Sequence, residues 1–165
     1  MAKIDLKEVT LLMKDGTTPT ANQVEIKVGE GTLTYTEARN MEYSLDRGLL
    51  DTVREGDQIP VAVSFDMIWE SLKSFTSATP TPEEALKREG AAAAWVSSSS
   101  DVCEPYAIDI ELTHDPVCDI QDLEQITISD FRWESIDHDV QDGTMSVSGN
   151  ANVTRVTIVH LPQTT

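Results

Sequence analysis

Hydrophobic and polar residues alternate with a period of two along much of this chain. The clearest run is Pro60–Trp69, which reads PVAVSFDMIW. Its large apolar side chains fall on one side of an extended chain, Ala62, Ser64 and Asp66 fall on the other, and Ile68 breaks the pattern. Such alternation is typical of a β-strand with one buried face, so we predict a strand here.

Further strands are predicted from the same alternation and from short apolar runs. They are Val9–Met13, Asn22–Val28, Leu33–Thr36, Tyr106–Thr113, Glu124–Ile128, Asp130–Val140, Thr144–Val153 and, as a last strand or a terminal arm, Arg155–Leu161. The dipeptide Asp142-Gly143 predicts a tight hairpin turn. We expect the core to contain Leu33, Tyr35, Val61, Val63, Phe65, Phe131, Trp133, Met145 and Val147.

One helix is predicted. Thr81 can cap its N-terminus, Pro82 suits the first helical position, Glu84 completes a capping box and Gly90 marks the end. The length predicts one domain, residues 1–165, with residues 154–165 as a candidate C-terminal arm. The predicted fold class is mainly β: an antiparallel β-sandwich with one flanking α-helix and a long inter-strand loop.

The segment between Leu33–Thr36 and Pro60–Trp69 is far longer than a hairpin needs, and we predict a charged loop. Long ordered loops usually serve a partner. Charges of both signs can fix the register of neighbouring copies, and two leucines would act as apolar anchors. We therefore expect the loop Asn40–Ile59 to contact other subunits. The residues concerned are Glu42, Asp46, Arg47, Leu49, Leu50, Asp51, Arg54, Glu55 and Asp57.

The chain is strongly acidic, with 29 acidic and 12 basic residues and a formal net charge of -17. Because phosphates dominate nucleic-acid affinity, this charge argues against attractive binding to nucleic acid. It argues equally against binding to anionic membranes. Two interpretations fit: a solvated surface that keeps the protein soluble, and a surface built to repel DNA.

The sequence also bears on the compartment. No stretch is apolar for long enough to span a bilayer, and the N-terminal residues MAKIDLKEVTLL lack the features of a secretory signal. We therefore expect synthesis in a cytoplasm, where Cys103 and Cys118 would be reduced. Neither a CxxC motif nor a His/Cys cluster accompanies them, which argues against zinc.

Candidate chemistry is sparse. Asp137-His138-Asp139, followed by Asp142 and Gly143, vaguely resembles a calcium loop, but the spacing requires a Glu near position 148, where Ser148 stands. A polar strand end before a turn is the simpler interpretation. No phosphate loop, nucleophile elbow or Cys/His pair appears in the sequence. We predict no enzyme, no cofactor and no metal.

Several segments together resemble the tail tube proteins, also called major tail proteins, of long-tailed bacteriophages. They are GEGTLTYTEARNMEYSLDRGLLDTVREGD, PVAVSFDMIWE, PTPEEALKREGAAAAWVSSSSDVCEPYAIDIEL and VCDIQDLEQITISDFRWESIDHDVQDGTMSVSGNANV, and they lie in matching order within roughly residues 22–153. The N-terminal strands and the tail RVTIVHLPQTT match less clearly.

The resemblance implies hexameric rings that stack into a tube around a tape-measure protein, which later leaves so that the genome can pass. The implied partners are other copies of the chain, the tape-measure protein and tail-end proteins. The implied location is the virion, after synthesis in a bacterial cytoplasm. If four strands from each of six subunits close into one inter-subunit β-barrel, it has about 24 strands, more than the 16–18 that already enclose a water channel.

The polar faces of four strands would then line the lumen. The candidates are Thr34, Thr36, Ser64, Asp66, Asp130, Glu134, Ser146 and Ser148. An acidic wall repels DNA and lets it slide, whereas a basic wall would hold its phosphates. Arg132 does not fit such a wall, and we expect it to pair with a neighbouring carboxylate or to lie at an interface. Two alternatives stay open: a monomeric acidic β-sandwich that binds a ligand through its loops, and a DNA mimic that binds basic proteins.

Overall fold

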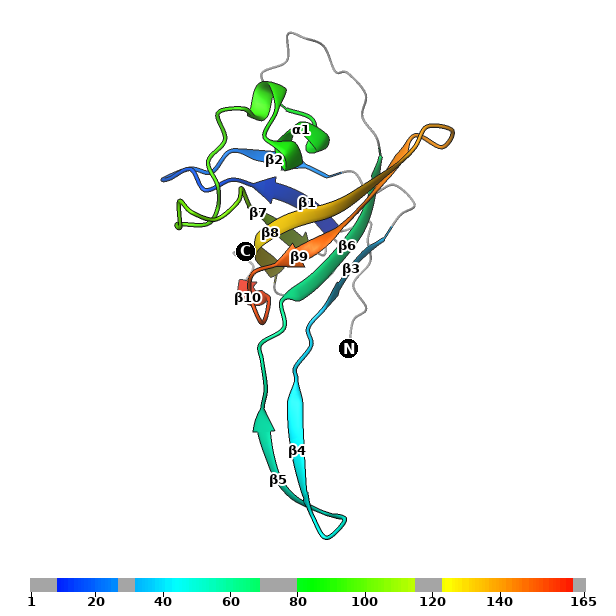
Figure 1. Cartoon of the computed structure of the whole chain (residues 1–165). Coiled ribbons are helices and arrows are strands. Elements are labelled where there is room, and N and C mark those ends of the chain that lie inside the picture. Colours follow the sequence, from blue (N-terminus) through cyan, green and yellow to red (C-terminus); the bar gives the residue numbers. More distant parts are fainter. Residues whose placement is uncertain (1–8, 27–31, 69–79, 115–122, 162–165) are drawn as a thin grey trace.

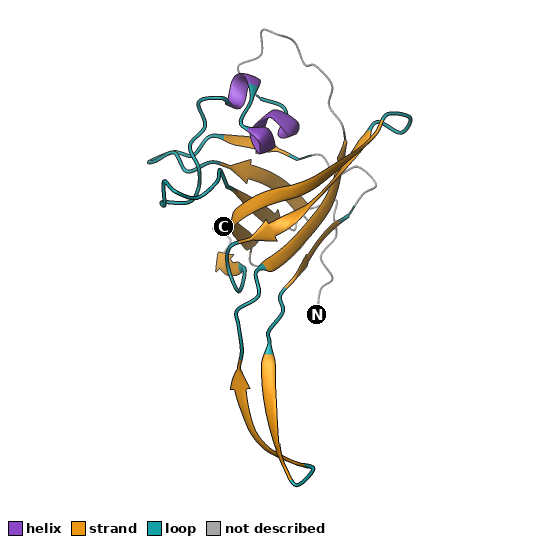
Figure 2. Ribbon diagram, viewed as in Figure 1, coloured by secondary structure: helices purple, strands orange, loops and turns teal. Residues whose placement is uncertain are grey.

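The structure is a computed structural model that describes residues 9–26, 32–68, 80–114 and 123–161. Its elements in chain order are β1 (Val9–Lys14), β2 (Gln23–Glu25), β3 (Leu33–Thr36), β4 (Met41–Asp46), β5 (Leu49–Glu55), β6 (Val61–Ile68), α1 (Pro82–Lys87), the 3₁₀ helix η2 (Gly90–Ala92), β7 (Ile108–His114), β8 (Leu123–Asp139), β9 (Thr144–Ala151) and β10 (Thr157–Leu161). Strands dominate the chain (Figure 2), which confirms the mainly β prediction. Trp69 and Cys118, named above, lie outside the described residues.

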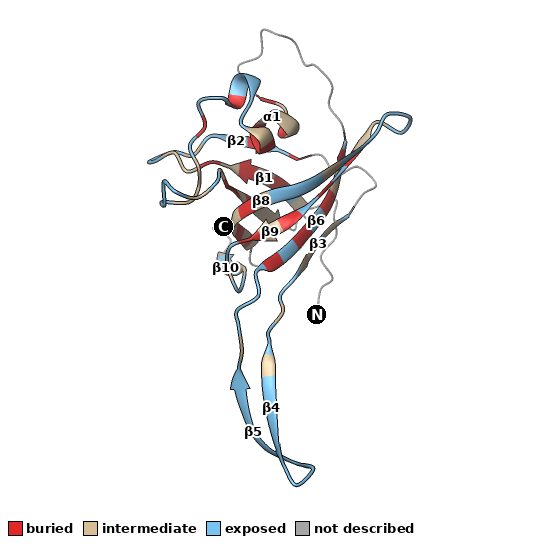
Figure 3. Ribbon diagram, viewed as in Figure 1, coloured by how far each residue is buried: buried red, intermediate tan, exposed pale blue. Residues whose placement is uncertain are grey.

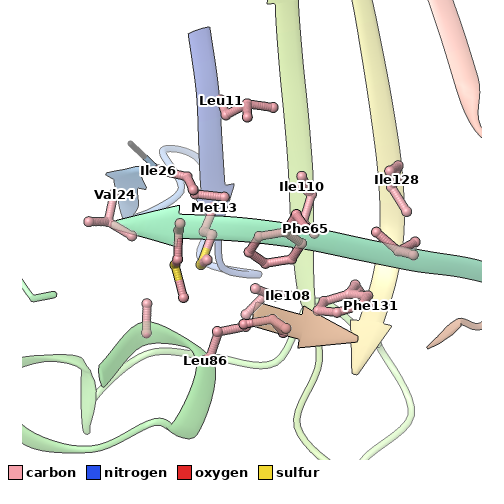
Figure 4. Close-up of a cluster of buried hydrophobic side chains, with 14 of the residues drawn as sticks. Leu11, Met13, Val24, Ile26, Phe65, Leu86, Ile108, Ile110, Ile128 and Phe131 are labelled. Atoms are coloured by element: carbon pink, nitrogen blue, oxygen red, sulfur yellow. The ribbon is translucent and has the colours of Figure 1, made fainter. Parts of the chain in front are cut away.

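Eight strands form one antiparallel sheet in the order β2-β1-β7-β8-β9-β6-β3, with β10 also paired to β8. Strand β8 serves two layers. Its first half pairs with β7 and β10, and its second half pairs with β9. The layers fold over each other at β8, so that β6 crosses β1, β7 and β8 in Figure 4.

The prediction of two separate strands, Glu124–Ile128 and Asp130–Val140, is wrong, because β8 is one continuous bent strand. Asp130 has a φ of 56°, and the register against β7 shifts between Ile128 and Phe131. The backbone N–H of Asp130 donates to the Asp109 carboxylate at 3.0 Å. A bulge with one left-handed residue bends a strand without ending it.

The core lies between the two layers. One layer contributes Leu11, Met13, Ile108, Ile110 and Ile128, and the other contributes Val61, Val63, Phe65, Met67, Phe131, Met145, Val147 and Ala151. The rings of Phe65 on β6 and Phe131 on β8 have centroids 6.0 Å apart (Figure 4). These residues confirm the predicted core face, with Leu33 and Tyr35 half-buried at its margin.

Trp133 is the exception. We predicted it to be in the core, but 41% of its surface is exposed. It lies on the core side of β8, opposite Gly149 on β9, in the half of β8 that pairs with no strand on its other edge among the described residues. Its indole therefore lacks a neighbouring strand to cover it.

Helix α1 closes one end of the sandwich and brings Ala85 and Leu86 into the core. Thr81 caps it as predicted, accepting a hydrogen bond from the Glu84 N–H at 3.3 Å. The helix ends earlier than predicted, because Arg88 takes the left-handed conformation (φ 56°) at its C-terminus, two residues before Gly90. Gly90 begins η2, which continues the cover over the core with Ala92 and Trp95.

Asp15 ties two loops together beside this helix. Its buried carboxylate accepts hydrogen bonds from Thr17 and Asn22, each through backbone and side chain, and from the Val96 N–H at 3.2 Å. Burial raises the pKa of this carboxyl, but the hydrogen bonds outweigh burial and leave the pKa below its ordinary value. The charged form is thus the one that the fold stabilises.

Substitution Asp15→Asn should lower the free energy of unfolding by about 1–3 kcal/mol at pH 7, because the new amide presents N–H groups to N–H and O–H donors. Since the folded-state pKa is depressed, the wild-type advantage is full above the ordinary carboxyl pKa of about 4 and is lost as the pH falls through the folded-state value. Urea unfolding of both proteins at pH 7 and pH 3 measures this. The exposed control Asp57→Asn should change little, and a wild-type advantage that persists undiminished at pH 3 would contradict the assignment.

Candidate assembly interface

The outer face of the layer β3-β6-β9-β8 is mainly polar, with Ala62 and Ile68 of β6 as its apolar exceptions. Strand pairing aligns its side chains in rungs. One rung contains Thr34, Ser64, Ser148 and Ser135, and the next contains Asp66, Ser146 and Asp137. The Ser146 hydroxyl donates to the Asp66 carboxylate at 2.7 Å. This polar face therefore consists mainly of short hydroxyl side chains, with carboxylates toward the β8–β9 turn.

The structure brings together six of the predicted lumen residues on the polar face: Thr34, Thr36, Ser64, Asp66, Ser146 and Ser148. Glu134 lies in a second bulge of β8, between Trp133 and Ser135, and accepts a hydrogen bond from the Asn150 amide on this face. Asp130 lies apart, in the bend of β8, where its carboxylate accepts a hydrogen bond from Ser98 at 3.0 Å.

Sequence reasoning missed Ser135 and Asp137, which share the polar face. The bulge at Glu134 shifts the alternation by one residue, so odd-numbered positions of β8 beyond it take the place of even-numbered ones. The sequence feature that could have indicated this bulge is Gly149, on the strand opposite it. A Cβ added there would lie 2.1 Å from the Arg132 carbonyl oxygen, so only glycine allows β8 to approach so closely.

Arg132 does not place its charge on the polar face. Its guanidinium donates to the Pro105 carbonyl and forms an ion pair with Glu104, each at 3.0 Å. The expected pairing with a neighbouring carboxylate is confirmed. The partner lies in the loop before β7, which draws the arginine toward the edge of the sheet.

Both edges of this four-stranded layer lack a partner strand within the described residues. On one side β3 pairs only with β6, and on the other the second half of β8 pairs only with β9. Each neighbouring pair is antiparallel, so the strand directions alternate across the layer. An unpaired edge presents rows of N–H and C=O groups that can accept another strand.

The segment that we predicted as a loop is a β-hairpin, β4–β5, that projects far from the body (Figure 1). Its two-residue turn is Arg47-Gly48, with φ values of 51° and 81°, as a type I′ turn requires. Cross-strand pairs join its polar side, where Glu42 contacts Arg54 and Ser44 contacts Thr52. The sequence did not predict this hairpin, because Arg47 occupies the first turn position, where Asn or Asp is the usual signal of such a turn.

The hairpin carries an apolar ladder that no other described part of the chain covers. Tyr43 pairs with Val53 and Leu45 pairs with Leu50 on one side of the ribbon. Their exposed fractions lie between 53% and 77%, and Leu49 in the same hairpin is 73% exposed. Figure 3 shows that the hairpin is exposed along its length except at the start of β4, where Met41 is half-buried. Leu49 and Leu50 are thus accessible, as are Tyr43, Leu45 and Val53, and the contact of the two leucines with another subunit stays a prediction.

The charged residues predicted for this segment follow the hairpin. Glu42, Asp46, Asp51, Arg54 and Glu55 lie on its strands. Arg47 forms the turn, and Asp57 lies at the base, beyond β5. Each is exposed. The hairpin therefore offers apolar contact area on one side and paired charges on the other.

No group of three or more His, Cys, Asp or Glu side chains in the described ranges is placed to hold a metal ion. No helix within those ranges has the length and apolar character needed to cross a membrane.

Cys103 is a free, exposed cysteine. His138, from the Asp137–Asp139 triplet, lies 3.0 Å from Glu83 of α1, which also pairs with Lys87 at 2.8 Å.

The comparisons with known proteins establish the fold. No family model matches the chain, and no curated protein matches it by sequence. Among solved structures, a sheath/tube terminator of the PVC extracellular contractile injection system, in the extended state, is similar with a TM-score of 0.56 and 10% identity, over 96% of this chain and 98% of that one. A chain of the anti-feeding prophage baseplate is similar with a TM-score of 0.44 and 10% identity, over 96% of this chain and 97% of that one. The chain therefore shares its fold with a component of phage-like tail machinery.

Proposed function

We propose that this chain is the tube subunit of a bacteriophage tail: a structural protein whose hexameric rings stack into a conduit for DNA. The observation that carries the proposal is the four-stranded layer with two unpaired edges and one polar outer face. The fold of a sheath/tube terminator supports it, as does the resemblance of the sequence to tail tube proteins.

Ring closure follows from the two edges. If β3 of one copy lies beside the second half of β8 of the next, the alternating strand directions continue without interruption. The result is an antiparallel barrel. Six copies supply about 24 strands, enough to enclose a wide aqueous channel. Closure also removes edges that otherwise invite disordered aggregation.

The polar face would line the lumen of this barrel. Its hydroxyl groups give a smooth, hydrated wall, and Asp66 and Asp137 add negative charge. DNA carries about one charge per 1.7 Å of axis, so it is repelled and passes without specific binding. Arg132 fits this role because Glu104 neutralises it at the edge of the face.

The hairpin extends two adjacent lumen strands, β3 and β6, beyond the body (Figure 1). In a stacked tube this direction leads to the neighbouring ring. Its apolar ladder gains a partner there, and its charges fix the register of stacking. A tape-measure protein inside the tube and tail-end proteins at its termini complete the set of partners, in a virion assembled in the host cytoplasm.

Electron microscopy of the purified protein in negative stain tests the proposal. We expect rings or tubes that increase with protein concentration, because association buries the hairpin ladder and pairs both edges. A protein that sediments only as a monomer at every concentration and salt level, and that shows no rings, would support the alternative of a soluble acidic binding module.

A second experiment tests the hairpin. The triple variant Tyr43→Ser, Leu45→Ser and Leu50→Ser should keep the free energy of unfolding of the body of the subunit within about 0.5 kcal/mol of wild type, because these side chains pair only across the exposed hairpin and belong to no part of the core. Tubes should be lost. Val102→Ser with Val140→Ser, which also replaces exposed apolar side chains, is the control and should still form tubes. Normal tubes from the triple variant would refute a role of the hairpin in stacking.

A third experiment tests the lumen. Tubes with Asp66→Lys and Asp137→Lys should retain double-stranded DNA at low salt and release it as salt rises, because phosphate contacts depend on counterion release. Wild-type tubes should retain none. The control Glu25→Lys with Asp101→Lys makes the same change in charge outside the polar face. Equal retention by control and test tubes would place Asp66 and Asp137 outside the lumen.

A further inference from the structure

The bend of β8 brings three oxygen-bearing side chains together where the two layers meet. Asp109 belongs to β7, Asp130 to the bend itself, and Ser98 to the loop before β7. The backbone N–H of Asp130 donates to the Asp109 carboxylate, and the Ser98 hydroxyl donates to the Asp130 carboxylate, each at 3.0 Å. Loop, strand and bend are therefore joined through two carboxyl groups.

These two carboxyl groups share one hydroxyl as a donor. Besides its bond to Asp130, the Ser98 side chain hydrogen-bonds to Asp109, where it lowers the pKa of the carboxyl. A serine hydroxyl has one proton to donate and lone pairs that accept, whereas an ionised carboxyl can only accept. When both carboxyls are ionised, the hydroxyl can satisfy only one of them at a time, so the group is one donor short.

The surroundings of Asp109 favour a proton on its carboxyl. Burial raises the pKa most, the hydrogen bonds from Asp130 and Ser98 lower it, and the charges of Asp130 and Glu111 raise it again. Lys14 lies opposite Asp109 in the register of β1 and β7, but its ammonium group pairs with Glu111. The pKa of Asp109 therefore stays above the ordinary carboxyl value.

We infer that the bend of β8 is a pH-sensitive joint between the two layers, in which a protonated Asp109 donates to the Ser98 hydroxyl and this hydroxyl donates to Asp130. In that arrangement the missing donor is supplied and like charges no longer face each other. Once Asp109 ionises as the pH rises, the chain of hydrogen bonds loses one link and the joint opens more often. This joint is a property of the single subunit and does not depend on the proposed tube.

The direction of the pH dependence follows from the raised pKa. The contribution of Asp109 to stability is full below the ordinary carboxyl pKa of about 4, and it is lost as the pH rises through the folded-state value. Asp15 has the opposite dependence, because its lowered pKa places its loss below about pH 4. Measurements at pH 4.5 and pH 7 therefore separate the joint from Asp15.

Hydrogen exchange with mass spectrometry tests the joint on the whole chain at these two pH values, with rates corrected for the chemical effect of pH. In wild type we expect residues 128–132 to be several-fold better protected at pH 4.5 than at pH 7. Asp109→Asn should be equally protected at both, because its amide accepts the Asp130 N–H and donates to Ser98 at either pH. Wild-type protection at the bend that does not rise in acid would overturn the joint.

The control Asp57→Asn removes the same charge at an exposed position outside the bend, so it should keep the wild-type pH dependence. A variant Asp109→Asn that keeps the wild-type acid response, or a control that loses it, would show that net charge and not the joint is responsible.

Ser98→Ala distinguishes the hydrogen-bond chain from burial alone. Asp109 stays buried in this variant, so acid would still protect the bend if burial were the whole cause. In the joint the hydroxyl is the link between the two carboxyls, and we expect the difference in protection between pH 4.5 and pH 7 to be lost. A full acid response in Ser98→Ala would overturn the joint. This comparison with wild type decides the question even if Asp109→Asn fails to fold.

Discussion

The bend of β8 at Asp130 is the constraint on which the rest of the fold depends. One residue with a positive φ lets a single 17-residue strand leave one layer and enter the other without losing its hydrogen-bonded neighbours. The Asp109 carboxylate holds the bend by accepting the Asp130 N–H. Burial of Asp109 raises the pKa of its carboxyl, although hydrogen bonds from Asp130 and Ser98 oppose the rise. The bend at Asp130 therefore sets how the two layers enclose the core and which way the polar face points.

The molecule combines a well-packed body with margins, by which we mean the sheet edges and side chains that stay open to solvent. Within the body, the core side chains from both layers are fully covered, and Asp15 and α1 close the end of the sandwich. The margins are two sheet edges, one exposed indole and one protruding hairpin. Each margin presents hydrogen-bonding groups or apolar area that the subunit alone leaves to solvent. Such a distribution is expected of a part that reaches its lowest free energy only in an assembly.

Much of this could be read from the sequence. Alternation at Val61–Met67 and the turn at Asp142-Gly143 identified β6 and the β8–β9 hairpin, and Thr81 with Pro82 identified the start of the helix. Three features were missed, two of them because tertiary backbone geometry decides them. The bend at Asp130 and the bulge at Glu134 change which face a side chain takes, and no propensity marks either position except Gly149 on the opposing strand. The third feature, the β4–β5 hairpin, was not predicted because its turn is Arg-Gly instead of the usual Asn-Gly or Asp-Gly.

The apolar ladder of the hairpin has a consequence for when assembly can begin. A free subunit that exposes such a ladder would be prone to colloidal aggregation, yet each copy also carries a formal net charge of -17. Long-range repulsion between like-charged copies opposes their random encounter, while the attraction of the ladder acts only at contact. The formal charge therefore opposes random encounters between free copies, and contact through the ladder is favoured only where a high protein concentration or added salt offsets the repulsion.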